Sequence, residues 1–427
     1  MTVSRFLWVL RAAAAAAICL RLALPAFAEA PVGPPVAAIA ARVEPRGAET
    51  RLTFELSAPV KAEAFVAAGP RVVIDLPQVV FLMDPAIGRE AGAAGKSAPT
   101  LIKSYRFGQF APGRARILIE LSGPARVARA ESVKSEEGAK LEIDLAPESA
   151  DKFAEATAAR QRAALAAPAE PAEREAVAES GDAALPLVVI DPGHGGVDVG
   201  ASSRHGEVEK TIVFEFAKAL KAKIEAKGKQ RALLTRSDDS FVALDDRVSF
   251  AQEHGAALLL SIHADTLSSA DSVRGATVYT GAARASDAEA ARIAARENLA
   301  DEAAGLESKA EAEEVGDILL ELTRRETRAL SRDFSAQLID KWRKSGNLNK
   351  NPSRSAHFRV LKAHDTPSAL LELGYLSSDR DLANLTSPQW REQAAEGVAE
   401  AIAAFFQARA PVAARVDPTT TNSAHRR

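Results

Sequence analysis

The first part of the chain alternates apolar and polar residues with a period of two. Successive side chains of a strand point to opposite faces, so this alternation predicts half-buried β-strands. We therefore expect residues 36–146 to form a small all-β, sandwich-like domain. It contains no His or Cys and no cluster of acids, so binding is its expected role. The clearest strand-like segments, separated by Gly and Pro, are 51–57, 65–77, 115–121 and 139–145.

The pattern changes after residues 147–185, which are rich in Ala, Glu and Pro and have the composition of a linker. From 186 to 408, short apolar runs alternate with amphipathic helical stretches. This order predicts an α/β domain with a mixed sheet flanked by helices. Residues 409–427 are expected to form a disordered tail. The expected strands are 187–191, 231–235, 257–262, 276–280, 358–361 and 369–373, and the expected helices are 208–227, 243–254, 316–344 and 389–407.

Residues 1–28 have the features of a secretory signal peptide. A basic start with Arg5 is followed by an apolar run that ends in Ala-Phe-Ala. Arg11 and Arg21 interrupt this run, so it is too short between charges to span a membrane. We expect cleavage after Ala28, export to the periplasm and no membrane span in the mature chain.

Composition narrows the possible functions. The 427 residues carry a net charge of −3, with 26% charged and 47% hydrophobic residues. These values exclude a collagen, a fully disordered chain and a strongly basic nucleic-acid binder, so no nucleic-acid partner is expected. The single cysteine, Cys19, lies in the predicted signal peptide and excludes a disulfide framework. A metal would therefore be held by His and carboxylate groups.

Two histidines follow predicted strands in a way that favours a metal site. His194 lies in the glycine-rich loop of VVIDPGHGG, and His263 ends the apolar run ALLLSIH. Sites of open α/β sheets lie at the carboxyl ends of strands, so both imidazoles would face one crevice. Glu209 lies in the first turn of the helix predicted between them. Two His and one Glu with a free fourth position form the zinc pattern of hydrolases. From spacing alone, ordinary buried polar roles for these residues remain equally open.

Glu372 stands inside the apolar run SALLELG. A carboxylate buried there is costly unless it is paired or functional, and burial raises its pKa. Such a group suits a general base that takes a proton from a metal-bound water. The alternative is a glutamate at a strand edge that points to solvent.

Four segments in order resemble the zinc-dependent N-acetylmuramoyl-L-alanine amidases of the cell-separation type: DPGHGGVDVGA, EVEKTIVFEFAKAL, LLLSIHAD and TPSALLELGYLSS. These enzymes cut peptidoglycan between N-acetylmuramic acid and the L-alanine of the stem peptide. The resemblance implies that His194, Glu209 and His263 bind Zn²⁺. It also implies that Glu372 is the catalytic residue. Ser378 and His364 depart from the usual pattern but do not affect these four positions.

The first domain is similar to the AMIN domain, on the segments RVVIDLPQVVF and IKSYRFGQFAPGRARILIEL. AMIN domains accompany these amidases and direct them to the cell wall at division sites. The resemblance therefore implies a targeting role for residues 36–146.

An insertion of about 285–315 lies between His263 and Glu372, and so between the third and last motifs of the catalytic domain. Ser286 and Glu289 have the spacing of a helix capping box. Ile293, Glu297 and Ala300 then share one mostly apolar helical face. A glutamate on such a face either lies at its solvated edge or has a function. The resemblance implies a helix that plugs the active site, with Glu297 as the candidate inhibitory ligand and Glu289 as the next. A LytM-type activator protein would then displace this helix.

Two other functions remain open on the sequence. A different zinc peptidase, such as a carboxypeptidase, would bring an arginine for the substrate carboxylate and other motif spacings. A non-enzymatic wall-binding protein would have lost catalytic residues, whereas all four are present here.

Overall fold

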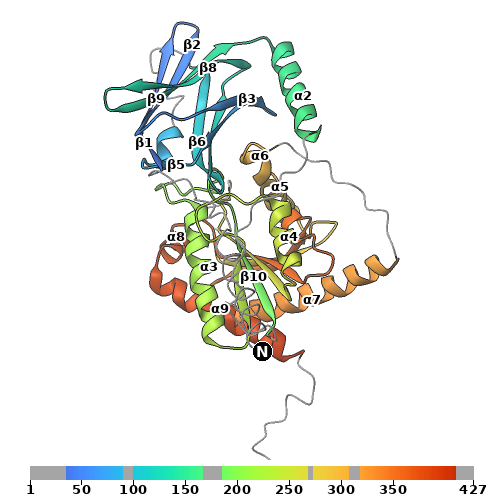
Figure 1. The fold of residues 1–427 in the computed structure, drawn as a ribbon. Helices are drawn as coiled ribbons and strands as arrows, with labels where there is room; N and C mark the ends of the chain where they lie inside the picture. Colours follow the sequence, from blue (N-terminus) through green and yellow to red (C-terminus); the bar gives the residue numbers. More distant parts are fainter. Residues whose placement is uncertain (1–34, 90–99, 167–184, 268–272, 307–317, 410–427) are drawn as a thin grey trace, which may run out of the picture. The chain divides into compact units, whose positions relative to one another are not determined.

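The structure is a computed structural model in which six segments are left undescribed (Figure 1). It describes residues 35–89, 100–166, 185–267, 273–306 and 318–409. The predicted signal peptide lies outside these ranges, as do 167–184 of the linker and nearly all of the predicted tail. Among the described residues, no helix combines the length and apolar character that crossing a membrane requires.

The N-terminal domain is all-β, as predicted, and consists of two sheets. One has five strands in the order β5-β1-β2-β9-β8, and the other has four in the order β3-β4-β7-β6. Neighbours are antiparallel except for β1 and β5. The strands are β1 (Val36–Arg46), β2 (Glu49–Leu56), β3 (Glu63–Ala67), β4 (Arg71–Pro77), β5 (Val79–Phe81), β6 (Ile102–Ala111), β7 (Arg114–Leu121), β8 (Ala125–Ser135) and β9 (Gly138–Pro147), with a 3-10 turn η1 at Pro85–Gly88.

Alternation decides which side chains of this domain are buried. Leu52 and Phe54 of β2 point to the same side as Leu141 and Ile143 of β9, and they meet the inward side chains of the second sheet. One prediction here was wrong in detail, because 65–77 is a hairpin of β3 and β4 and not a single strand. Gly69 makes the turn with a φ of 72°, a conformation that glycine adopts without steric cost.

The C-terminal domain has the predicted mixed sheet, in the order β11-β10-β12-β15-β13-β14. Strands β11, β10, β12 and β15 are mutually parallel, while β13 and β14 run the other way. The strands are β10 (Leu187–Pro192), β11 (Arg231–Leu234), β12 (Leu258–His263), β13 (Ala276–Gly281), β14 (Leu348–Ala356) and β15 (Ser368–Glu372). The helices are α2 (Ala150–Ala166), which precedes this domain, α3 (Glu209–Ala226), α4 (Leu244–Glu253), α5 (Ala288–Glu297), α6 (Ala300–Ala303), α7 (Ile318–Trp342), α8 (Asp379–Leu385) and α9 (Pro388–Gln407).

The strand predicted at 358–361 is instead a 3-10 turn, η2 (Arg359–Leu361). The sixth strand is β14, whose sequence LNKNPSRSA has no apolar alternation. β14 lies at the edge of the sheet, where one side of the strand is left unpaired and polar residues are tolerated. Its position in the sheet, and not its composition, makes it a strand.

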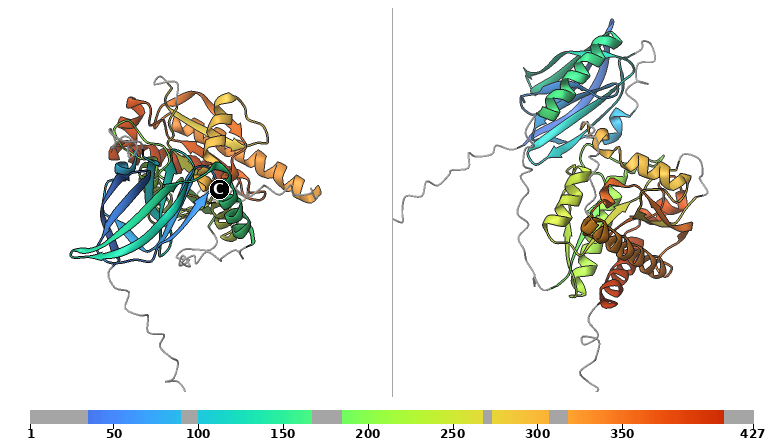
Figure 2. Two further views of the ribbon diagram at one scale, coloured as in Figure 1. Left: turned by 90° about the horizontal axis from the view of Figure 1, so that it is seen from above. Right: turned by 90° about the vertical axis from the view of Figure 1, so that its right-hand side faces the viewer.

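Helices cover both faces of the sheet (Figures 1 and 2). Helices α3, α7 and α9 pack on the face that presents Val188, Ile190 and Leu260. Helix α4 packs against the opposite face at Leu259, and α5 packs there at Leu370. The sheet is therefore buried in its middle, and the carboxyl ends of its parallel strands carry the polar residues described next.

Candidate active site

The parallel strands bring three of the predicted residues to one edge of the sheet. Pro192 at the end of β10 pairs with Ile262 of β12, so His194 follows on the same level as His263. His263 in turn is in register with Glu372 at the end of β15. Register alone therefore places two imidazoles and the predicted general base side by side.

His194 is held in an unusual backbone conformation. Its φ is 59°, and it is the only non-glycine residue with a positive φ among those described. Such strain is found where the surrounding structure enforces it, often at functional sites. The enforcing groups are two buried arginines, since Arg247 donates to the His194 carbonyl at 2.9 Å and Arg236 donates to that of Gly193 at 3.2 Å. The ring Nδ1 pairs with Asp198 Oδ2 at 2.8 Å, which leaves Nε2 to face the site.

Glu209 begins α3 and has no exposed surface. Each carboxylate oxygen accepts a backbone hydrogen bond at 2.8 Å, one from Ala201 and one from Ala264. The same oxygens lie 3.1 Å from His194 Nε2 and 3.1 Å from His263 Nδ1. A carboxylate at a helix N-terminus is favourable, and here it is aimed at both imidazoles.

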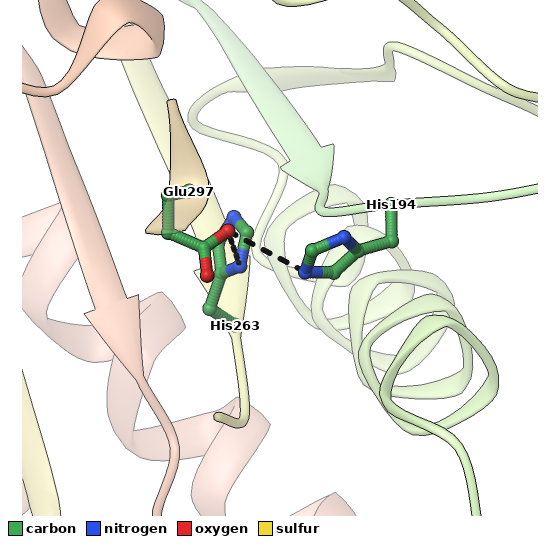
Figure 3. A group of neighbouring side chains, drawn as sticks. All are labelled: His194, His263 and Glu297. Atoms are coloured by element: carbon green, nitrogen blue, oxygen red, sulfur yellow. Dashed lines mark ion pairs between the residues drawn. The ribbon is translucent and has the colours of Figure 1, made fainter. Parts of the chain in front are cut away.

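Glu297 is the last residue of α5, and Figure 3 shows its carboxylate directed at the rings of His194 and His263. Its Oε2 lies 3.1 Å from His263 Nδ1 and 3.4 Å from His194 Nε2. The ligand atoms of these three residues lie within 4.8 Å of one another. The glutamate is buried, with 4% of its surface exposed, so the interpretation of a solvated helix edge was wrong.

The spacing and chemistry of this cluster fit a zinc ion. Ligands on zinc bonds of about 2.0–2.1 Å in a tetrahedron stand about 3.3 Å apart, and the distances above range from 3.1 to 3.4 Å. His194 Nε2 and Glu297 Oε2 are buried without a hydrogen-bond partner, which is costly unless another group satisfies them. Donors of this type, nitrogen and carboxylate oxygen, are those that zinc accepts.

The electrostatics also favour positive charge at this point. Burial opposes protonation of both imidazoles, but neighbouring carboxylates outweigh it. Glu209, Asp198 and Glu297 raise the pKa of His194 well above its usual value, and Glu297 with Glu209 raises the pKa of His263 to about 10. Burial would raise the pKa of Glu209, yet the two imidazoles hold it well below its usual value. A cation in this cluster would be stabilised by the same carboxylates.

Glu372 lies in the interior, with no exposed surface. Its Oε2 accepts a hydrogen bond from the Asp265 N–H at 3.0 Å, and its Oε1 has no hydrogen-bond partner. Burial raises the pKa of Glu372 to about 8, although the nearby His263 opposes the shift. A carboxyl with a pKa near neutral can both accept and return a proton. The alternative of a solvent-facing glutamate was wrong.

The described part of the inserted segment contains helices, as predicted, but its first turn differs from the prediction, and residues 307–315 lie outside the described residues. The N-cap of α5 is Asp287, whose side chain accepts from the Ala290 N–H at 2.9 Å, so the capping box assigned to Ser286 was wrong. Both residue types cap helices well, and the helix begins one residue later. Glu289 forms an ion pair with Arg292. Ile293 and Glu297 share the buried face as expected, while Ala300 belongs to the separate helix α6.

Two family models match the chain, and both agree with the two domains. The model for N-acetylmuramoyl-L-alanine amidase matches residues 188–404, and the model for the AMIN domain matches residues 40–145. The first covers half of the chain and contains every residue of the cluster. The chain belongs to the N-acetylmuramoyl-L-alanine amidases.

This amidase is also similar to individual proteins. N-acetylmuramoyl-L-alanine amidase AmiC of Escherichia coli O6:H1 is 30% identical over 88% of this chain and 91% of its own length. The amidase AmiA of Escherichia coli K12 is 35% identical over 52% of this chain and 76% of its own length. The solved structure of AmiC2 of Nostoc punctiforme is 29% identical, covers 52% of this chain and 97% of its own, and has a TM-score of 0.37.

Several residues of the amidase site were missed in the sequence. Asp198 lies in the same loop as His194, and an acid four residues after a candidate ligand was a usable signal. Asp191 is fully buried between Thr235, Ser261 and Arg247, and it anchors the arginine that holds the His194 loop. These partners are far apart in sequence, so no local pattern indicates them.

Proposed function

We propose that this chain is a periplasmic peptidoglycan amidase that cleaves the bond between N-acetylmuramic acid and the L-alanine of the stem peptide during wall turnover and daughter-cell separation. We further propose that Zn²⁺ is held by His194, Glu209 and His263. The observation that carries the proposal is that the Glu209 carboxylate contacts both imidazoles, and that His263 is in register with the buried Glu372. Membership of the amidase family supplies the reaction.

The chain's own residues suit amide hydrolysis. Bound zinc would acidify a water and polarise the substrate carbonyl. Glu372 accepts the proton that this water loses and delivers it to the L-alanine nitrogen as the amide bond breaks. Its raised pKa suits both transfers. Asp198 holds His194 in the orientation that presents Nε2, the usual role of a carboxylate behind a ligating imidazole.

We also propose that α5 inhibits the resting enzyme. Glu297 occupies the side of the cluster that a substrate carbonyl would approach, because it contacts both imidazoles. The segment is well anchored, since the Asn298 amide donates to the His357 carbonyl and accepts from the Arg359 N–H, both at 2.8 Å. Asp301 adds a hydrogen bond from the Leu244 N–H at 2.9 Å. Opening must break all of these contacts.

An activator is needed because this arrangement favours the closed state. A partner of the LytM type would activate the enzyme by binding the open state more tightly than the closed one. The AMIN domain, proposed to span 36–146, would place the enzyme on the wall, and residues 147–185 would link it to the catalytic domain at 186–408. Bulk charge does not draw a chain of net charge −3 to an anionic wall, so targeting requires specific contacts.

The decisive experiment incubates the zinc-loaded full-length mature protein with purified sacculi and identifies the released fragments by mass. We expect slow release of free stem peptides from the wild type and at least tenfold faster release from Glu297→Ala. Glu289→Ala is the matched control, because Glu289 lies on the same helix and, among the described residues, its ion pair is with Arg292 and not with the histidines. Glu372→Gln should bind zinc and release nothing. A Glu372→Gln variant with full activity would overturn the assignment.

The same fragments separate the other functions. Loss of terminal amino acids from intact stems would indicate a carboxypeptidase. No release from zinc-loaded Glu297→Ala, together with binding to sacculi, would indicate a wall-binding protein without activity.

A further inference from the structure

A second carboxylate, Asp265, lies beside the catalytic glutamate and has no assigned role. It follows His263 by two residues and is 1% exposed. Its backbone N–H donates to Glu372 Oε2 at 3.0 Å, and its Oδ1 accepts from the Thr266 N–H at 2.6 Å. Its Oδ2 is buried without a hydrogen-bond partner.

Helix α5 covers this carboxylate with a cation. Arg296 forms an ion pair with Asp265 and donates to the Thr266 carbonyl at 3.0 Å. The neighbouring residue, Glu297, contacts the two histidines. Two successive residues of α5 thus place an anion against the imidazoles and a cation against Asp265. The surface beneath α5 therefore has two binding positions. The imidazoles can receive an electron-rich oxygen, and Asp265 can receive N–H donors.

Departure of α5 would remove the Arg296 cation from the Asp265 carboxylate and open this carboxylate to water and substrate. A carboxylate in an open site accepts charge-assisted hydrogen bonds, so an N–H group of the substrate can take the place of the guanidinium while the enzyme works. Glu372, which hands its proton to the departing nitrogen, is held by the backbone of the same residue. Asp265 is therefore close to the nitrogen of the scissile amide, and so to the N–H groups at the L-alanine end of the substrate.

We propose that Asp265 is a substrate-binding residue that accepts hydrogen bonds from the N–H groups of the stem peptide at its L-alanine end, and that Arg296 occupies this subsite in the closed enzyme. The proposal rests on the proposed amidase function. The carbonyl of the scissile bond would lie toward the histidines, and its nitrogen toward Glu372 and Asp265. After cleavage, the L-alanine ammonium meets the carboxylate that held the guanidinium. We assign this subsite to the peptide side and not to glycan hydroxyls, because the group that contacts Asp265 in the closed enzyme is an N–H donor, the Arg296 guanidinium.

The test compares two variants that break the same ion pair in the full-length chain. Arg296→Ala and Asp265→Ala both remove the contact of α5, so hydrogen exchange of the backbone amides of 288–303 should rise equally in both. Arg296→Ala should then release stem peptides from sacculi faster than the wild type. Asp265→Ala should not, because it also loses the substrate contact.

Asp265→Asn isolates the charge while retaining the shape. In the Glu297→Ala background, it should lower kcat/KM on a soluble muropeptide about tenfold, at unchanged zinc content and melting temperature, since hydrogen bonds to charged groups are about twice as strong as neutral ones. It should also weaken binding of a free stem peptide to the zinc-loaded Arg296→Ala protein by a similar factor, measured by calorimetry. A denuded glycan strand should bind with equal affinity to the Arg296→Ala protein and to the Arg296→Ala, Asp265→Asn protein.

Several results would overturn the proposal. Equal activation by Asp265→Ala and Arg296→Ala would make Asp265 only an anchor of α5, and unchanged peptide affinity in Asp265→Asn would give the same conclusion. Loss of glycan binding instead of peptide binding would assign the residue to the other side of the scissile bond. Failure of the amidase function would appear differently, as no release by zinc-loaded Glu297→Ala with Asp265 intact.

Discussion

Gly200 lies against two of the proposed zinc ligands, and a single methyl group at this position would collide with both. Its φ is 67°, and a Cβ there would stand 2.5 Å from His194 Cδ2 and 2.7 Å from Glu209 Oε2. The backbone conformation costs an L-residue about 1–2 kcal/mol, and overpacking adds about 1–3 kcal/mol. Gly200→Ala should therefore lower the free energy of unfolding of the zinc-free protein by about 2–5 kcal/mol.

The metal should be affected as well, because the methyl group must push His194 or Glu209 from its position. We expect zinc affinity, measured by competition with a chromophoric chelator, to fall by about 10–100-fold, the range seen when ligand orientation is disturbed. Gly228→Ala is the matched control, since its φ is 62° and its added Cβ meets nothing within 4 Å. The control should lose about 1–2 kcal/mol and bind zinc normally. If Gly200→Ala and Gly228→Ala behave alike in urea unfolding and in zinc titration, the close contact of Gly200 with His194 and Glu209 affects neither the free energy of unfolding nor zinc affinity, and the prediction is wrong.

Three further changes test the support of the site. Asp198→Asn should weaken zinc binding about 10–100-fold by calorimetry, with the fold retained by circular dichroism, because the charged partner of His194 is lost. Asp191→Asn should cost about 3–5 kcal/mol in urea unfolding, since Arg247 would stay buried without its carboxylate. Burial opposes ionisation of Asp191, but Arg247, Thr235 and Ser261 outweigh it and lower its pKa. Its ionisation therefore stabilises the fold above the unfolded pKa of about 3.9, and the difference between wild type and Asp191→Asn should shrink as the pH falls below about 4. Phe334→Ala in the core between α7 and the sheet should cost about 3–5 kcal/mol, and a loss below about 1 kcal/mol would contradict tight packing there.

The sequence could predict those parts of the site that depend on a single strand end. His194, His263 and Glu372 each follow an apolar run, so their positions at one sheet edge could be inferred once the strands were recognised. Glu209 could be placed because helix α3 starts where its amphipathic pattern starts. The roles of these residues came from the family resemblance, and their zinc coordination remains a prediction.

The rest depends on contacts between distant segments. Nothing near Asp191 in the chain indicates that Arg247 will reach it, and nothing near Asp265 indicates Arg296. Strand β14 was missed for a related reason, because an edge position lets a polar segment join the sheet. The capping error at Ser286 was of another kind, since two neighbouring residues could both cap α5 and the packing of the helix selected Asp287.

The inserted helices lie within the connection from β13 to β14, two neighbouring strands of the same sheet. If α5 inhibits the enzyme as proposed, this inhibitor is attached to the chain at both of its ends, so its effective concentration at the site is set by the chain and not by dilution. Closure would then be intramolecular and would resume whenever a bound partner leaves. The activity of such an enzyme would depend on whether the activator is bound at that moment and would stop when the activator leaves, which suits a hydrolase that acts on the cell wall.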